Sequence, residues 1–296
     1  MKKIKKNRLE RVGVMDIFLV IILGMLAFLT ILPFYQVILL SFADSITYAT
    51  HPIYLLPYSF DLTGYKTVMA DRYFWSSLLN SLFVTVVGTL VNMYLSVTGA
   101  YVLSRKTLVG RQFFLNLVLI PMFFGGGLIP TYIVGTSLGL KNNIWCMILP
   151  TAISTYYMII MKNYFVAFPD GLIEAAKIDG ANEFQVLIKV VLPISVPFMA
   201  TFALFYSVAR WNEWYYANIY INKKLLAPLQ IYLRNTIVNM GNNLSDIAKQ
   251  FATAGKVNLT QVQMTTIVIT AVPILCVYPF VQKHFVKGIL VGSLKE

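Results

Sequence analysis

Long apolar stretches recur along this sequence and constrain its fold more than any other feature. Six can be placed, at 17–41, 77–103, 112–134, 144–166, 194–219 and 263–282. Each is long enough to cross about 30 Å of hydrocarbon as a helix. Only 12% of the residues are charged, whereas a soluble domain has about 25%. We therefore predict an all-α, polytopic membrane protein with six transmembrane helices.

The basic residues indicate how these spans are oriented. Residues 1–16 carry six Lys or Arg, and the apolar stretch that follows is longer than the core of a signal peptide. If the first span begins in the cytoplasm, fifteen Lys and Arg lie inside, eight lie outside and Arg210 lies within a span. This bias agrees with the positive-inside rule. We predict a multi-pass protein of the cell membrane with both termini cytoplasmic, whose net charge of +12 requires no nucleic-acid partner.

A polar interruption at 168–193 separates the fourth and fifth spans on the cytoplasmic side. Its sequence predicts a first short helix, capped by Asp170 and ended by Gly180, because glycine tolerates a left-handed backbone. A second helix is predicted to begin at a capping box made by Asn182 and Gln185. The pattern alone also fits an ordinary interfacial connection between two spans.

The residue spacing in this interruption resembles the EAA motif of the membrane subunits of ABC importers. Glu174-Ala175-Ala176 is followed after three residues by Gly180, and after nine more by Val190-x-Leu192-Pro193, where Val190 replaces the usual Ile. In that family the loop is cytoplasmic, and its short coupling helix docks into a groove of the ATPase subunit. The resemblance implies that the ATPase-coupling residues are Glu174, Ala175, Ala176, Asp179, Gly180, Leu192 and Pro193.

Further segments resemble carbohydrate importer permeases of the MalG type. Asn80-Ser81 and Ala100–Arg105 match the two ends of their second span, although Asn80 also fits a helix cap. Gly127–Leu140 is similar to the oligosaccharide-importing branch, which includes LplC-like, rhamnogalacturonan and aldouronate permeases, and Lys283–Leu294 is similar to the usual ending of the family. The resemblance covers nearly the whole chain, and implies that 17–296 is a transmembrane permease domain with the type I ABC importer fold.

The resemblance also implies partners. These are a second, homologous permease chain, an ATPase dimer on the cytoplasmic side and an extracellular solute-binding protein. The sequence has no G-x-x-x-x-G-K-[ST] phosphate loop, so ATP and Mg²⁺ would be bound by the partner ATPase and no cofactor is expected in this chain. Two histidines and two cysteines form no ligand cluster or nucleophile arrangement, and we expect a transport subunit rather than an enzyme.

Two groups of residues within predicted spans are candidates for the substrate path. A glycine run that includes Gly126 is expected to break the third span, as happens where a helix lines a cavity, although close packing explains the glycines equally well. In the outer third of the fifth span, Arg210 and Glu213 are three residues apart and can pair. The predicted path residues are Asn80, Gly126, Arg210, Trp211, Asn212 and Glu213. The alternative for the last four is a local ion pair in an aromatic interfacial belt.

The sequence thus predicts the permease subunit of an ATP-driven importer of oligosaccharides. Lys223, Lys224 and Arg234 lie outside and hint at an acidic substrate, and Leu229–Val238 is predicted as a surface helix. The main alternative is an ion-coupled secondary transporter of a small polar solute, for which Glu213 is the clear intramembrane carboxylate. A membrane scaffold that transports nothing is a third hypothesis.

Overall fold

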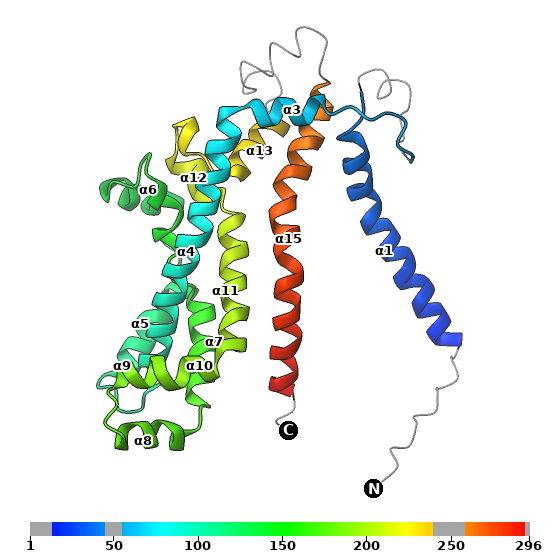
Figure 1. The fold of residues 1–296 in the computed structure, drawn as a ribbon. Coiled ribbons are helices and arrows are strands. Elements are labelled where there is room, and N and C mark those ends of the chain that lie inside the picture. The colour runs from blue at the N-terminus through cyan, green and yellow to red at the C-terminus, as the bar shows by residue number, and fades with distance from the viewer. Residues whose placement is uncertain (1–13, 45–54, 239–257, 294–296) are drawn as a thin grey trace.

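The structure of the chain, a computed structural model, describes residues 14–44, 55–238 and 258–293. Residues 1–13 of the predicted basic segment 1–16 lie outside these ranges. All regular elements in the described ranges are helical (Figure 1). In chain order they are α1 (Val14–Leu40), α3 (Thr63–Ala70), α4 (Arg72–Ser104), α5 (Arg111–Phe123), α6 (Leu128–Ser137), the 3-10 helices η1 (Ile144–Met147) and η2 (Leu149–Thr151), α7 (Thr155–Val166), α8 (Asp170–Ile178), α9 (Glu183–Val186), the π-helical turn η3 (Leu187–Val191), α10 (Leu192–Ile194), α11 (Val196–Trp211), α12 (Tyr215–Tyr220), the 3-10 helix η4 (Lys224–Leu226), α13 (Leu229–Val238) and α15 (Leu259–Ser293).

Three helices among the described residues are individually long and apolar enough to cross a membrane: α1, α4 and α15. Three bent combinations pass the same test. They are α5 with α6, bent by 118°, η1 and η2 with α7, bent by 49°, and α9 and α10 with α11 and α12, bent by 89°. Counting each bent combination as one span gives six, and the six predicted stretches fall on these elements. The all-α, six-span prediction is confirmed.

The third span breaks at the glycine run. α5 ends at Phe123 and α6 begins at Leu128. Between them Gly127 has a φ of 82°, a left-handed value that residues with a side chain rarely adopt. The predicted break is therefore confirmed, and 112–134 is not one continuous helix.

α4 is the central helix of the bundle. α7 and α11 pack along it, α15 packs against α11, and α1 contacts α15 and then diverges from it toward the N-terminus (Figure 1). Glycines allow two of these close approaches. A Cβ at Gly99 would lie 2.8 Å from the Met158 sulfur of α7, and one at Gly88 would lie 2.8 Å from Arg210 Cδ of α11. Such close packing of small residues is the usual basis of helix association in lipid.

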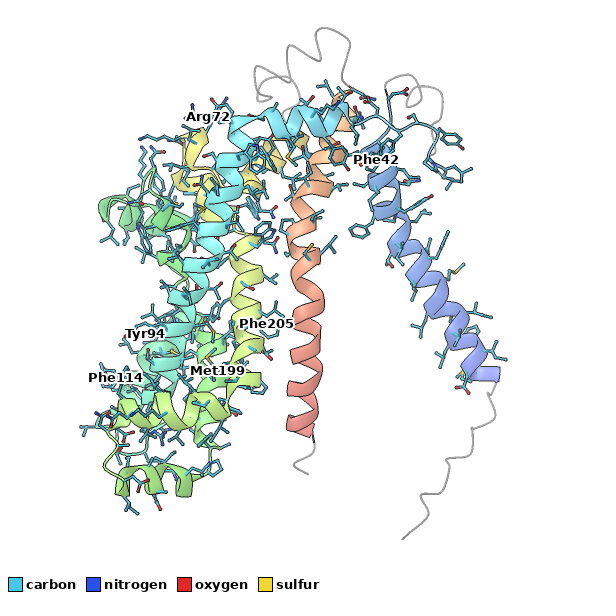
Figure 2. The ribbon with its side chains drawn as sticks, in the orientation of Figure 1. Phe42, Arg72, Tyr94, Phe114, Met199 and Phe205 are labelled. Atoms are coloured by element: carbon cyan, nitrogen blue, oxygen red, sulfur yellow. The ribbon has the colours of Figure 1, made fainter. Side chains whose placement is uncertain are left out.

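The two ends of the bundle carry different elements (Figure 1). α8 and α9 lie at one end, and α3, α12 and α13 lie at the other. A large buried cluster occupies the half nearer α8; it includes Met199 of α11, and Phe205 packs against it (Figure 2). The helix α13 lies at the opposite end. It spans Leu229–Val238, the range that the sequence predicts as a surface helix.

Candidate coupling site

The segment 168–193 folds as two short helices joined by a tight turn. Gly180 follows α8 with a φ of 83°, as its predicted role in ending the helix requires. The predicted capping box is also confirmed: Asn182 Oδ1 accepts the Gln185 backbone N–H at 2.9 Å, and Gln185 Oε1 accepts the Asn182 backbone N–H at 3.0 Å. The predicted cap at Asp170 is wrong, because Pro169, whose backbone is not helical, takes the cap position and Asp170 lies in the first turn of α8.

The second helix leads from this turn into the bundle. After α9 it widens into the π-helical turn Leu187–Val191, and Leu192 and Pro193 of the motif then begin α10. Proline has no backbone N–H to donate. The regular helical hydrogen bonding ends with α10, one residue after Pro193. The chain bends by 89° between α10 and α11. The Leu-Pro pair therefore stands at the corner where the segment joins the fifth span.

One face of the segment is part of the buried core. Ile173 of α8 and Val186, Leu187 and Val191 of the second helix are buried in one cluster with side chains of α4, α7 and α11. Ala176 and Leu192 are partly buried and pack against the same cluster. The segment is thus fixed to three helices of the bundle rather than hanging from it as a loose connection.

The opposite face is exposed and carries most of the motif. The exposed motif residues are Glu174, Ala175, Asp179, Gly180 and Pro193. Four large apolar side chains are exposed on the same segment, those of Leu172, Ile178, Phe184 and Ile188, and Ile178 is 86% exposed. Apolar groups that remain exposed among polar residues are typical of a surface that binds another protein.

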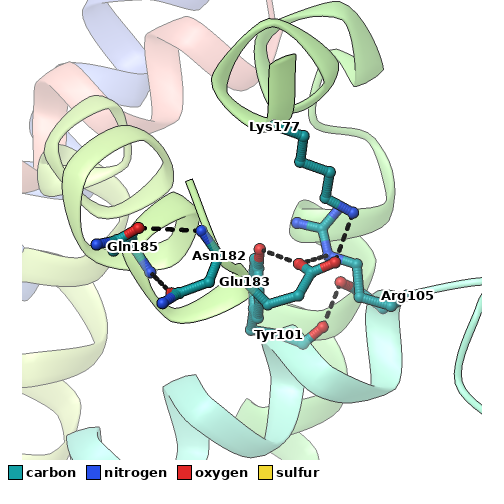
Figure 3. A network of polar contacts seen from close by, with 7 residues as sticks. Tyr101, Arg105, Lys177, Asn182, Glu183 and Gln185 are labelled. Atoms are coloured by element: carbon teal, nitrogen blue, oxygen red, sulfur yellow. Dashed lines mark hydrogen bonds and ion pairs between the residues drawn. The ribbon is translucent and has the colours of Figure 1, made fainter. Parts of the chain in front are cut away.

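A carboxylate that the sequence analysis did not select ties the segment to α4 (Figure 3). Glu183 Oε1 pairs with Lys177 Nζ of α8 at 2.5 Å, and Glu183 Oε2 accepts a hydrogen bond from the Tyr101 hydroxyl of α4 at 3.0 Å. Arg105 Nε lies 4.0 Å from the same oxygen, and the Arg105 guanidinium lies 4.2 Å from the centre of the Tyr101 ring. The motif that ends the second span supplies both Tyr101 and Arg105, but the sequence does not indicate that Glu183 is their partner.

These contacts hold the pKa of Glu183 below its usual range. The hydrogen bond from Lys177 is the largest cause, the Tyr101 hydrogen bond and the charge of Arg105 act in the same direction, and partial burial opposes them. A carboxylate with a depressed folded-state pKa contributes stability above its unfolded pKa of about 4.3. That contribution is lost as the pH falls through the folded-state pKa. The tie between α8, α9 and α4 is therefore intact at neutral pH and weakens only in acid.

Replacing Glu183 with glutamine should loosen α8 at pH 7. The amide keeps an oxygen for Tyr101 but loses the ionic attraction to Lys177, and because both charged groups are about half exposed the loss is about 0.5–1 kcal/mol. We expect hydrogen–deuterium exchange of 170–178 to become about two- to fivefold faster, as that free energy implies. Glu174→Gln, which alters an exposed carboxylate on the same helix, is the control. Equal exchange in Glu183→Gln and the control would contradict the role given to Glu183.

Arg210, a predicted path residue, is buried among the helices. Its side chain is 4% exposed. Nε donates to Asn92 Oδ1 of α4 at 3.1 Å, Nη1 donates to the Met147 carbonyl, and Nη2 donates to the Thr151 carbonyl at 2.6 Å. Arg210 of α11 thus bonds both to α4 and to the backbone carbonyls of the last residues of η1 and η2.

The predicted ion pair between Arg210 and Glu213 is not formed. α11 ends at Trp211, so the two side chains are not on one helical face, and Glu213 Oε1 instead accepts the backbone N–H of Tyr216 at 2.9 Å. Trp211 is buried in a cluster with side chains of α4, α13 and α15. Asn212 is exposed.

The other two path residues lie apart from this group. Asn80 is within α4 and is not its cap; its Nδ2 donates to the carbonyls of Leu225 and Ala227 at 2.8 and 3.2 Å, which anchors the chain before α13. Gly126 is exposed in the break of the third span, and it lines a largely apolar pocket of about 410 Å³ together with Tyr220 of α12. The structure therefore does not bring the six predicted path residues into one site.

Comparisons with known proteins identify the family. Residues 13–291 match the model of the binding-protein-dependent transport system inner membrane component. The chain belongs to this family. It is 42% identical over 290 residues to the polygalacturonan/rhamnogalacturonan transport system permease protein YtcP of Bacillus subtilis (strain 168), covering 98% of this chain and 99% of that protein. It is 43% identical over 288 residues to Protein LplC of the same organism, covering 95% of each.

A solved structure agrees with this assignment. The permease resembles a chain in the crystal structure of a bacterial ABC transporter involved in the import of the acidic polysaccharide alginate, with a TM-score of 0.88 and 31% identity over 95% of this chain and 100% of that one. The resemblance seen in the sequence is therefore confirmed. This binding-protein-dependent permease is a multi-pass membrane transport subunit of an ABC importer and not an enzyme. Family membership decides against the ion-coupled secondary transporter and the scaffold.

Proposed function

We propose that this permease forms half of the transmembrane path of an ATP-driven importer of acidic oligosaccharides. It lies in the cell membrane with both termini in the cytoplasm. A second, homologous permease supplies the other half of the path, and an extracellular solute-binding protein delivers the substrate. An ATPase dimer binds ATP and Mg²⁺ on the cytoplasmic side. The substrate class is supported by relatives whose names refer to polygalacturonan, rhamnogalacturonan and alginate.

The two-sided build of the segment 168–193 is the observation that carries this proposal. Its inner face is buried against α4, α7 and α11, and its outer face presents the EAA motif and exposed apolar side chains. A segment fixed in this way transmits motion as a rigid body. When the ATPase pair closes on ATP, the segment moves with its docking groove, α7 and α11 move with it, and the path opens outward.

Within the segment the motif residues divide by position. Glu174, Ala175, Asp179 and Gly180 are exposed and meet the ATPase, whereas Ala176 faces the core and Leu192 and Pro193 form the corner at the fifth span. Of the six predicted path residues, we assign Gly126, Asn212 and Glu213 to the lining of the substrate path, because Gly126 and Asn212 are exposed and Glu213 is only partly buried. Arg210, Trp211 and Asn80 support the surrounding helices.

The docking face is tested by replacing Ile178 with aspartate. Ile178 is 86% exposed, so the change places a charge on the outer face of α8 without disturbing the core. From gently solubilised membranes, the tagged permease should recover its second permease and an active ATPase, and Ile178→Asp should reduce the recovered ATPase at least about tenfold, as for loss of an apolar anchor at an interface. Val109→Asp, at a position 89% exposed in the connection between α4 and α5, is the control. A wild-type chain that purifies alone would overturn the proposal.

A further inference from the structure

Four polar side chains form what we call the outer cluster, at the end of the bundle opposite α8. They are Asn212, Asn218, Gln230 and Arg234. Gln230 and Arg234 are four residues apart, so they share one face of α13. Gln230 Nε2 donates to Asn212 Oδ1 at 3.3 Å, and Arg234 Nη1 donates to Asn218 Oδ1 at 3.0 Å. These bonds fix α13 against the C-terminus of α11 and against α12, which lies beside α13 in Figure 1.

The hydrogen-bonding capacity of the outer cluster is only partly used. Arg234 is exposed and commits one guanidinium nitrogen to Asn218. In the part of the chain that the structure describes, the ion pairs are Arg105–Glu183 and Lys177–Glu183, both at the other end of the bundle. The planar guanidinium fork matches a carboxylate and can hold both of its oxygens at once. Arg234 is thus a positioned cation that lacks an acidic partner within these residues.

Aromatic side chains flank the outer cluster. Trp214 and Tyr215 follow Asn212 after Glu213. They are 46% and 44% exposed, and their rings meet edge to face with centroids 6.0 Å apart. Each has a flat apolar face and a polar tip, and the C–H face of a pyranose ring packs on such a surface. An arginine, three amides and two exposed aromatic rings together match the groups of an acidic sugar: its carboxylate, its hydroxyls and its ring.

We infer that the outer cluster receives the carboxylate of an acidic sugar unit as it enters the path, with Arg234 as the residue that selects it. The inference rests on the proposed import of oligosaccharides and assigns the preference for acidic ones to a residue of this chain. A neutral sugar makes the amide and aromatic contacts but leaves the guanidinium without a charged partner. Lys223 and Lys224 precede α13 at the same end of the bundle and add positive charge that attracts an anionic substrate.

The test compares two trisaccharides that differ in charge. The complete transporter, with its binding protein, is reconstituted in proteoliposomes, and ATP-driven uptake of trigalacturonate and of its methyl ester is measured at concentrations that saturate the binding protein. Arg234→Gln should lower the ratio of acid to ester uptake by about tenfold, the size expected for one charge-assisted hydrogen-bond pair. Arg234→Lys, which keeps the charge but not the fork, should recover part of the ratio. Arg72→Gln, at another exposed arginine of the same end, is the control.

The possible results separate the inference from the function on which it rests. Equal losses for both sugars in Arg234→Gln would overturn the inference, because a purely structural Arg234–Asn218 bond predicts that result. The same ratio change in Arg72→Gln would also overturn it, since general surface charge would then be the cause. Wild-type uptake of the ester alone would overturn acid selection and leave oligosaccharide import standing. Uptake of neither sugar by a complex that hydrolyses ATP would overturn the proposed substrate class itself.

Discussion

Replacement of Arg210 with methionine is expected to destabilise the permease by about 2–5 kcal/mol. For the three bonds to Asn92, Met147 and Thr151, the lower value takes ~0.6 kcal/mol for each hydrogen bond between helices in a membrane, and the upper value takes ~1.5 kcal/mol for each bond from a charged donor. Met147 and Thr151 are the last residues of η1 and η2, and carbonyls at such ends have no partner within their own helix. Within hydrocarbon no water replaces the lost donor. The fourth span should therefore lose the hydrogen bonds that it receives from Arg210, whereas the bond from Asn92 Nδ2 to the Thr151 carbonyl remains.

The measurement is the unfolding midpoint of the purified chain in detergent. Arg210→Lys should fall between wild type and Arg210→Met, because one ammonium cannot reach Asn92, Met147 and Thr151 together. Gly88→Ala is an independent probe, since its new Cβ would lie 2.8 Å from Arg210 Cδ. Gly88→Ala should destabilise the wild type and have much less effect in the Arg210→Met background, because contacting residues are not additive. Additive effects, or an unchanged midpoint in Arg210→Met, would contradict this account.

Features set by neighbours in sequence were predictable without knowledge of the fold. The end of α8 at Gly180 could be predicted, because it depends only on the backbone φ of Gly180 itself. The Asn182–Gln185 box needs two side chains to reach backbone three residues away. The break at Gly127 likewise depends on local backbone preference. The error at Asp170 is of the same local kind, since the preceding proline shifts the helix start by one residue.

Partners remote in sequence could not be predicted in the same way. The sequence offered Glu213 as the nearest countercharge for Arg210, whereas its partners Asn92 and Thr151 lie 118 and 59 residues away. Asn80 bonds to the carbonyl of Leu225, 145 residues further on. A polar residue in an apolar span shows that a partner is needed, but helix packing alone decides which group meets it. Glu183 was missed for this reason, because its bond to Tyr101 spans 82 residues.

The resemblance to the importer family located the coupling segment but not its two faces. Which residues are available to an ATPase follows from packing against α4, α7 and α11, and the exposure of Ile178 and Phe184 beside buried Ile173 was not evident from the motif. A change that shifts the exposed face of the segment 168–193 without disrupting its buried face should therefore damage coupling more than it damages folding. Gly180, at the turn between α8 and α9, is the position where such a disturbance can be made.

Gly180→Val is expected to abolish most ATP-driven uptake while the permease still inserts and ATP is still hydrolysed. A β-branched residue at a φ of 83° is strained by about 1–2 kcal/mol or more. Nothing lies within 4 Å of a Cβ at this position, so the effect comes from backbone strain and not from a clash. The turn relieves the strain by changing its shape, and α8 then shifts against the core that holds Ile173 and Val186. We expect uptake to fall at least about tenfold, as a small misplacement of a rigid element can cause.

Gly171→Val is the matched control for this variant. Gly171 lies on the same helix, a Cβ there also has open space around it, and its backbone does not adopt a positive φ. Gly180→Asn is the conservative change, because asparagine enters the left-handed region more readily than valine. Uptake and ATP hydrolysis measured together in proteoliposomes should show coupling lost in Gly180→Val, largely kept in Gly180→Asn and kept in Gly171→Val. Normal uptake by Gly180→Val would remove the rigid turn from the mechanism, and equal uncoupling by Gly171→Val would assign the effect to added volume on α8 instead of to the backbone of the turn.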